Sequence, residues 1–264
     1  MQDSPDYRDA GSKKAPSVVF LPGLFLNSMM WAPQIETLSL DYYCLAFDLE
    51  STTGDGAYRP FTVDTMAERL EGIVKKAKAK KPVLCGHSLG GYVALRALER
   101  DPKAYSGLIL CDAHPGAPSN PELLYWSGIL DQLYDGETEK TVRHVMEDLF
   151  DETTREEEGS PFEDLVEKAA ARETGLLASQ VIATMTRLDT QESLEGSPVP
   201  KLLITGQNDK FAPPDDMIDL GLRITGAQFV RVPDTGHAAP AEHPSLVLKA
   251  FNRFLRGVYG GEGA

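Results

Sequence analysis

The sequence predicts an α/β protein, with a mostly parallel sheet of about six strands flanked by helices and interrupted by a helical insertion. Two observations support this class. Short runs of β-branched and aromatic residues alternate along the chain with segments of helical periodicity. Most of these runs are apolar throughout, which is typical of strands that helices cover on both faces. The predicted strands are residues 17–21, 42–47, 82–85, 107–111, 201–205 and 228–232.

The first half of the chain begins with a polar segment. Residues 1–16 are rich in charged side chains and contain no apolar run, so we expect a polar tail outside the sheet and no secretory signal. The strand 17–21 ends at a Pro-Gly pair, which favours a turn. Apolar residues at helical spacing after Thr62, a suitable N-cap, predict a helix before the strand 82–85.

Residues 113–198 break this alternation, because they contain no convincing strand. Four stretches instead repeat apolar residues at helical spacing, starting near Leu123, Val142, Leu165 and Val181. A helical insertion between two strands of a parallel sheet would lie over the strand ends, where α/β proteins bind ligands. We therefore expect residues 17–112 and 199–264 to form the core, and residues 113–198 to form a helical cap.

The alternation resumes after the insertion. Two apolar strands follow it, and Val247, Phe251 and Phe254 then share one face of a predicted helix. This helix completes the core.

Composition and charge narrow the classes of partner. The chain carries 26 Lys and Arg against 40 Asp and Glu, a formal net charge of -14, which would repel nucleic acid and anionic lipid surfaces. Three widely spaced cysteines in strand-like segments predict buried thiols rather than disulfides or a metal site. No apolar stretch approaches the length of a membrane span. We expect a cytoplasmic protein with a small-molecule substrate, and both a monomer and a homodimer stay open.

A GxSxG motif, residues 86–90, lies directly after one strand and before a helix-like segment. In this context the motif forms a nucleophile elbow, in which a sharp turn exposes the serine and the glycines let strand and helix approach closely. The helix N-terminus favours a developing negative charge. We therefore expect Ser88 to act as a nucleophile. The alternative is a tight turn that merely contains a serine.

A serine nucleophile needs a base, and the base needs a group that fixes its tautomer. His237 lies in the loop after the last strand, where the chain order of nucleophile, acid and base requires it. The other histidines lie in the elbow, in the insertion or at the start of the last helix: His87, His114, His144 and His243. Asp209, just beyond the strand 201–205, is the expected acid, and Asp112, which also follows a strand, is the alternative.

Backbone N–H groups would have to stabilise the oxyanion of a tetrahedral intermediate. Leu89 follows the nucleophile and would supply one of them. The loop after the first strand would supply the second, from Leu24 or alternatively from Phe25. Side chains that could line an apolar substrate pocket are Phe25, Trp126, Met146 and Met185, although such residues at helical spacing are more often core.

Five segments in this order make the chain similar to the α/β-hydrolase superfamily, and within it to small carboxylesterases and enol-lactonases. They are VVFLPGLFLNSMMW, LCGHSLGGYVALR, GLILCDAHPG, LLITGQNDKFAPP and VPDTGHAAPAEHP. The chain departs from many relatives in two ways. Pro22 stands where those relatives have a His before the glycine of the oxyanion loop, and their two additional N-terminal strands are not expected here.

The resemblance implies a serine hydrolase without a cofactor or metal, which cleaves a small or medium neutral carboxylic ester through an acyl-enzyme on Ser88. A carboxylesterase is therefore the expected activity. A lactonase, a thioesterase or a C-C bond hydrolase could use the same three residues, and so could an acyltransferase. A ligand-binding receptor on a hydrolase fold is the alternative from another class.

Overall fold

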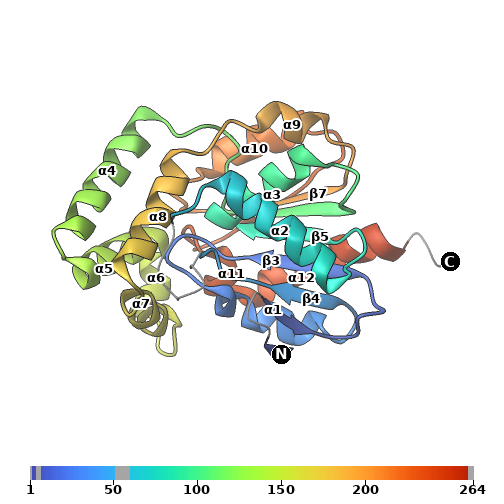
Figure 1. The fold of residues 1–264 in the computed structure, drawn as a ribbon, viewed down its shortest axis with the longest axis horizontal. Coiled ribbons are helices and arrows are strands. Elements are labelled where there is room, and N and C mark those ends of the chain that lie inside the picture. Colours follow the sequence, from blue (N-terminus) through green and yellow to red (C-terminus); the bar gives the residue numbers. More distant parts are fainter. Residues whose placement is uncertain (1, 4–6, 51–59, 261–264) are drawn as a thin grey trace.

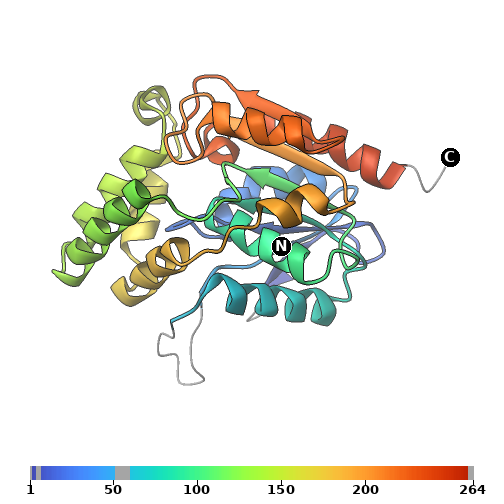
Figure 2. The same cartoon turned by 90° about the horizontal axis from the view of Figure 1, so that it is seen from above.

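A mostly parallel β-sheet forms the core of the protein, as the sequence predicts. The computed structural model describes residues 2–3, 7–50 and 60–260. The sheet has the strand order β1-β2-β4-β3-β5-β6-β7-β8, and all neighbours from β4 to β8 are parallel. Helices cover both faces of this sheet (Figures 1 and 2).

Six strands lie where the apolar runs predicted them. Those from β3 to β7 are buried along their whole length, because helices pack on both faces. β8 is an edge strand and is partly exposed. Their bounds are β3 (Ser17–Leu21), β4 (Tyr43–Ala46), β5 (Val83–His87), β6 (Gly107–Cys111), β7 (Lys201–Gly206) and β8 (Gln228–Val232).

The N-terminal segment corrects the prediction. The described part of residues 1–16 is not a tail outside the sheet, because β1 (Gln2–Asp3) and β2 (Arg8–Ala10) extend the sheet to eight strands rather than about six. β2 pairs antiparallel with β4. The Asp9 carboxylate, 7% exposed, accepts a hydrogen bond of 2.6 Å from the Tyr43 hydroxyl. β1 at the edge and β2 beside it are short and polar, so the pattern of apolar runs missed them.

The helices of the core form two layers. On one face η1 (Ser28–Trp31) and α1 (Ala32–Leu38) lie near α11 (Ala239–Glu242) and α12 (Pro244–Tyr259). On the other face α2 (Val63–Ala77) packs on α3 (Leu89–Arg100). α10 (Pro214–Arg223) contacts β7 and β8. Thr62 caps α2 as predicted, because its hydroxyl accepts a hydrogen bond from the Thr65 N–H.

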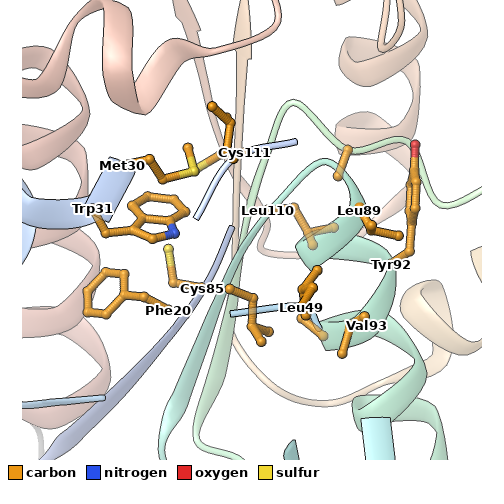
Figure 3. Close-up of a cluster of buried hydrophobic side chains, with 14 of the residues drawn as sticks. Phe20, Met30, Trp31, Leu49, Cys85, Leu89, Tyr92, Val93, Leu110 and Cys111 are labelled. Carbon is orange, nitrogen blue, oxygen red and sulfur yellow. The ribbon is translucent and has the colours of Figure 1, made fainter. Parts of the chain in front are cut away.

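Side chains of the central strands and of the helices packed on them form the hydrophobic core (Figure 3). Phe20 lies against Trp31 with a ring-centroid distance of 5.4 Å, and Trp31 also contacts Phe251 of α12 at 6.2 Å. The three cysteines are buried and free, as predicted. Burial raises the pKa of the Cys44 thiol to about 12, so this thiol is protonated at neutral pH.

Residues 113–198, which we call the helical insertion, connect β6 to β7. In Figures 1 and 2 most of its helices stand to one side of the sheet. α4 packs on α8 and on α5, and α5 packs on α7, while α9 contacts α3 of the core. The helices are α4 (Asn120–Tyr134), α5 (Thr138–Leu149), α6 (Glu152–Glu156), α7 (Phe162–Ala170), α8 (Thr174–Met185) and α9 (Gln191–Gly196). Among the described residues, no helix is both long and apolar enough to cross a membrane.

Candidate active site

The GxSxG motif forms a sharp turn between β5 and α3. Ser88, at the turn, has φ 47° and ψ -116°, a strained conformation that costs about 1–3 kcal/mol. A Cβ atom on Gly86 would lie 2.4 Å from the Gly90 carbonyl oxygen, and one on Gly90 would lie 2.4 Å from the Leu21 carbonyl oxygen. Neither position has room for a side chain. The two glycines therefore allow the close packing of strand and helix that holds Ser88 in its turn.

Three side chains predicted as one site lie in hydrogen-bond contact. Ser88 Oγ is 2.8 Å from His237 Nε2, and His237 Nδ1 is 2.7 Å and 2.8 Å from the two carboxylate oxygens of Asp209. A carboxylate oxygen accepts hydrogen bonds, so the contact with Asp209 selects the His237 tautomer with the proton on Nδ1. His237 Nε2 is then free to accept the Ser88 hydroxyl proton. All three residues are buried.

His87 lies inside the elbow but contributes to a different part of the site. Its Nε2 lies 2.6 Å from the backbone carbonyl oxygen of His237 and donates a hydrogen bond to it. Burial lowers the pKa of His87 to about 3, so the ring is neutral at neutral pH. A Cβ atom on Gly23 would lie only 2.2 Å from His87 Nδ1. His87 thus contacts the loops of His237 and Gly23, one on each side.

Asp112, the alternative acid, faces backbone rather than the imidazole of His237. Its carboxylate accepts hydrogen bonds from the N–H groups of Gly206 at 3.0 Å and Ala239 at 2.9 Å. Its burial raises its pKa well above the ordinary value. Across the described residues, no three His, Cys, Asp or Glu side chains come together as a metal site.

The loop after β3 presents two different backbone N–H groups. Phe25 has φ 61°, and its N–H donates a hydrogen bond of 2.8 Å to Gln180 Oε1. Gln180, fully buried on α8, donates in turn to the Leu49 carbonyl oxygen at 3.0 Å. The Leu24 N–H has no acceptor among the described residues. Leu89 is the first residue of α3, so its N–H has no partner within the helix.

Aromatic side chains surround one side of His237. Phe211 packs edge-on against the His237 ring at 5.1 Å and stacks on Trp126 of α4 at 5.5 Å. Trp126 is therefore the predicted pocket residue that the structure links to this site. Met146 is fully buried within the insertion, and Met185 is half-buried at the end of α8. The sequence gives no signal for Phe211 beyond its position two residues after Asp209.

Comparison with known proteins identifies the family. The profile of the alpha/beta hydrolase family matches residues 18–250. A pimeloyl-[acyl-carrier protein] methyl ester esterase from Stenotrophomonas maltophilia is 28% identical and covers 95% of this chain and 96% of its own.

Two solved structures share the fold. A thermophilic esterase from Thermogutta terrifontis has a TM-score of 0.88 and 26% identity, over 96% of this chain and 93% of its own. An enol-lactonase from Burkholderia xenovorans has a TM-score of 0.85 and 24% identity, over 94% and 95% of the two chains. With the profile match over most of its length, the chain belongs to the alpha/beta hydrolase family.

Proposed function

We propose that this protein is a serine hydrolase that cleaves a small or medium neutral carboxylic ester. The observation that carries the proposal is the continuous hydrogen-bonded chain from Ser88 through His237 to Asp209. In our proposal these residues act as nucleophile, base and acid. Membership of a hydrolase family supports this reading.

The reaction would proceed in two acyl transfers. Ser88 Oγ attacks the ester carbonyl carbon while His237 Nε2 takes its proton, and the tetrahedral intermediate then collapses as His237 returns that proton to the departing alcohol. Water, deprotonated by His237, attacks the acyl-enzyme and releases the acid. Asp209 stabilises the imidazolium that forms in each half-reaction.

The oxyanion would be stabilised by the N–H groups of Leu89 and Leu24. Both lack an acceptor among the described residues, so both are available to a substrate oxygen. Phe25 is the weaker candidate for the second donor, because its N–H already donates to Gln180.

The substrate class rests on the apolar wall beside His237 and on the relatives. Phe211 and Trp126 would accommodate an apolar acyl or alcohol group rather than a charged one. Two of the proteins compared above are esterases by name. We infer that the helical insertion acts as a cap over this substrate. A cytoplasmic location stays a prediction from composition.

The proposal is tested with a chain-length series of p-nitrophenyl esters. We expect Ser88→Ala to lower kcat by about five to six orders of magnitude. Ser193→Ala is a matched control, because its hydroxyl hydrogen-bonds Glu99 at 2.5 Å on the outside of the core, and it should keep native activity.

Three outcomes would reject or redirect the proposal. Activity that survives Ser88→Ala would remove Ser88 as the nucleophile. Ester products of an added alcohol would indicate an acyltransferase. Tight ligand binding by a native protein that does not turn over would indicate a receptor.

A further inference from the structure

Glu242, at the end of α11, is a buried carboxylate that holds two separate parts of the chain. Its Oε1 accepts hydrogen bonds from the N–H groups of Gly236 at 2.9 Å and Ala238 at 3.2 Å, which flank His237. Its Oε2 accepts a hydrogen bond of 2.8 Å from the N–H of Asp151, in the helical insertion. The residue is only 8% exposed. Such charge-assisted bonds are stronger than those between neutral groups.

The insertion and the loop that carries His237, residues 233–238, meet at this same place. The His237 N–H donates a hydrogen bond of 2.6 Å to the Leu149 carbonyl oxygen. A Cβ atom on Gly236 would lie 2.5 Å from that oxygen and 2.8 Å from the Asp151 nitrogen. The two backbones are therefore in direct contact, with no room for a side chain between them.

We propose that Glu242 is a positioning residue that couples the helical insertion to His237. This inference rests on the proposed function of His237 as the base. One carboxylate oxygen fixes the backbone on both sides of His237, and the other fixes the start of α6 at Asp151. A second buried carboxylate, Asp112, also fixes the chain just after His237, but its two hydrogen bonds go to core residues only. Glu242 is thus the carboxylate that joins the loop to the insertion.

The coupling predicts that the position of the insertion controls the geometry of the base. His237 Nε2 lies 2.8 Å from Ser88 Oγ when all these bonds are made. A displacement of about 1 Å between reacting groups can lower a rate about 100-fold. Loss of the Asp151 bond should therefore lower turnover, although Asp151 makes no hydrogen bond to Ser88 or His237.

A pair of substitutions at Asp151 perturbs this contact between the insertion and the loop. Asp151 has φ -63° and ψ 147°, which proline adopts without strain, and Phe150 before it is extended with φ -97° and ψ 142°. Asp151→Pro removes the N–H, and its ring occupies the space of the hydrogen bond. Asp151→Ala loses the same side-chain bonds, to Thr153 and Asn208, but keeps the N–H. The difference between the two variants therefore reports on the contact of the insertion with Glu242 and the loop, that is, on the lost hydrogen bond together with the space that the ring fills.

We expect Asp151→Pro to have a kcat about tenfold or more below that of Asp151→Ala, with KM changed less than about twofold. Amide hydrogen exchange in the peptide that contains residues 233–238 should be faster in the proline variant. Glu242→Gln is a second variant, because its amide must direct an NH₂ group at one set of N–H donors. It should lower kcat in the same way. Because buried N–H groups lose their acceptor, its melting temperature should fall as well, so kcat is compared at a temperature where the variant is folded.

Labelling of Ser88 by a fluorophosphonate separates the two possible failures. A native protein that is not labelled would refute the proposed function, and loop exchange would then test the coupling alone. If the native protein is labelled, equal labelling rates, equal kcat and equal loop exchange for Asp151→Pro and Asp151→Ala would overturn the inference. A normal kcat in Glu242→Gln would overturn it as well.

Discussion

Gln180 offers the sharpest test of how the loop after β3 is held. Gln180→Met conserves size and shape but leaves two buried groups without a partner, the Phe25 N–H and the Leu49 carbonyl oxygen. Each unsatisfied group costs about 1–3 kcal/mol. Because the methionine regains some apolar contact, we expect the free energy of unfolding to fall by about 3 kcal/mol. In a chain of this size the melting temperature should fall by about 6–12 °C.

The assay is urea unfolding followed by tryptophan fluorescence, together with p-nitrophenyl ester hydrolysis. A loosened loop should also lower kcat, by up to about 100-fold, because it would carry an oxyanion donor. Ile182→Met is the control on the same helix, since Ile182 is 37% exposed, and it should change stability by less than about 0.5 kcal/mol. A Gln180→Met variant as stable as this control would refute the reasoning.

Three further predictions test other parts of the structure. Gly206→Ala should abolish activity and lower the melting temperature, because its Cβ would lie 1.8 Å from the Gly236 carbonyl oxygen. Gly128→Ala is the control on α4, where a Cβ would meet nothing within 4 Å, and it should stabilise the protein by about 0.5–1 kcal/mol in the same melting assay. The pKa of His87 is lowered to about 3 by burial, so the unfolded state binds this proton first as the pH falls. The free energy of unfolding should therefore decrease from about pH 6.5 towards pH 3 by at most about 1.4 kcal/mol per pH unit. In His87→Gln, urea unfolding measured at a series of pH values should show a smaller decrease per pH unit. Arg187→Ala should lower the free energy of unfolding by about 2–4 kcal/mol, because it leaves Glu122, 2.8 Å away, without its buried partner. Arg187→Lys should be destabilised as well, and a lysine variant with native stability would contradict the argument.

Much of the fold could be predicted because the parallel strands are apolar on both faces. The six apolar runs became strands within a residue or two of their expected ends. β1 and β2 could not be predicted in this way. Arg8 and Asp9 are charged, so a strand is recognised there only from the pairing with β4. Short polar strands at or next to the sheet edge depend on pairing with their neighbours and not on their own hydrophobicity.

The candidate site also contains residues that could be predicted from the sequence and residues that could not. The positions of Ser88, Asp209 and His237 after strand ends carried enough information to choose them from sequence. Gln180 and Glu242 carried none, because their contacts join segments far apart in the chain. A buried amide or carboxylate on a helix looks like a solvated side chain until the tertiary structure supplies its partners.

Two of the contacts between the helical insertion and the core also bear on how such proteins could diversify. Gln180 holds the loop after β3, while Leu149 and Asp151 hold the loop that carries His237. An insertion taken from a relative would have to place both contacts correctly at the same time, or the two loops would lose their support. Exchange of whole insertions between relatives is therefore a poor route to new substrates. Substitutions between the two contacts, such as those around Trp126, leave the attachment intact and are the more accessible route, in evolution and in the laboratory.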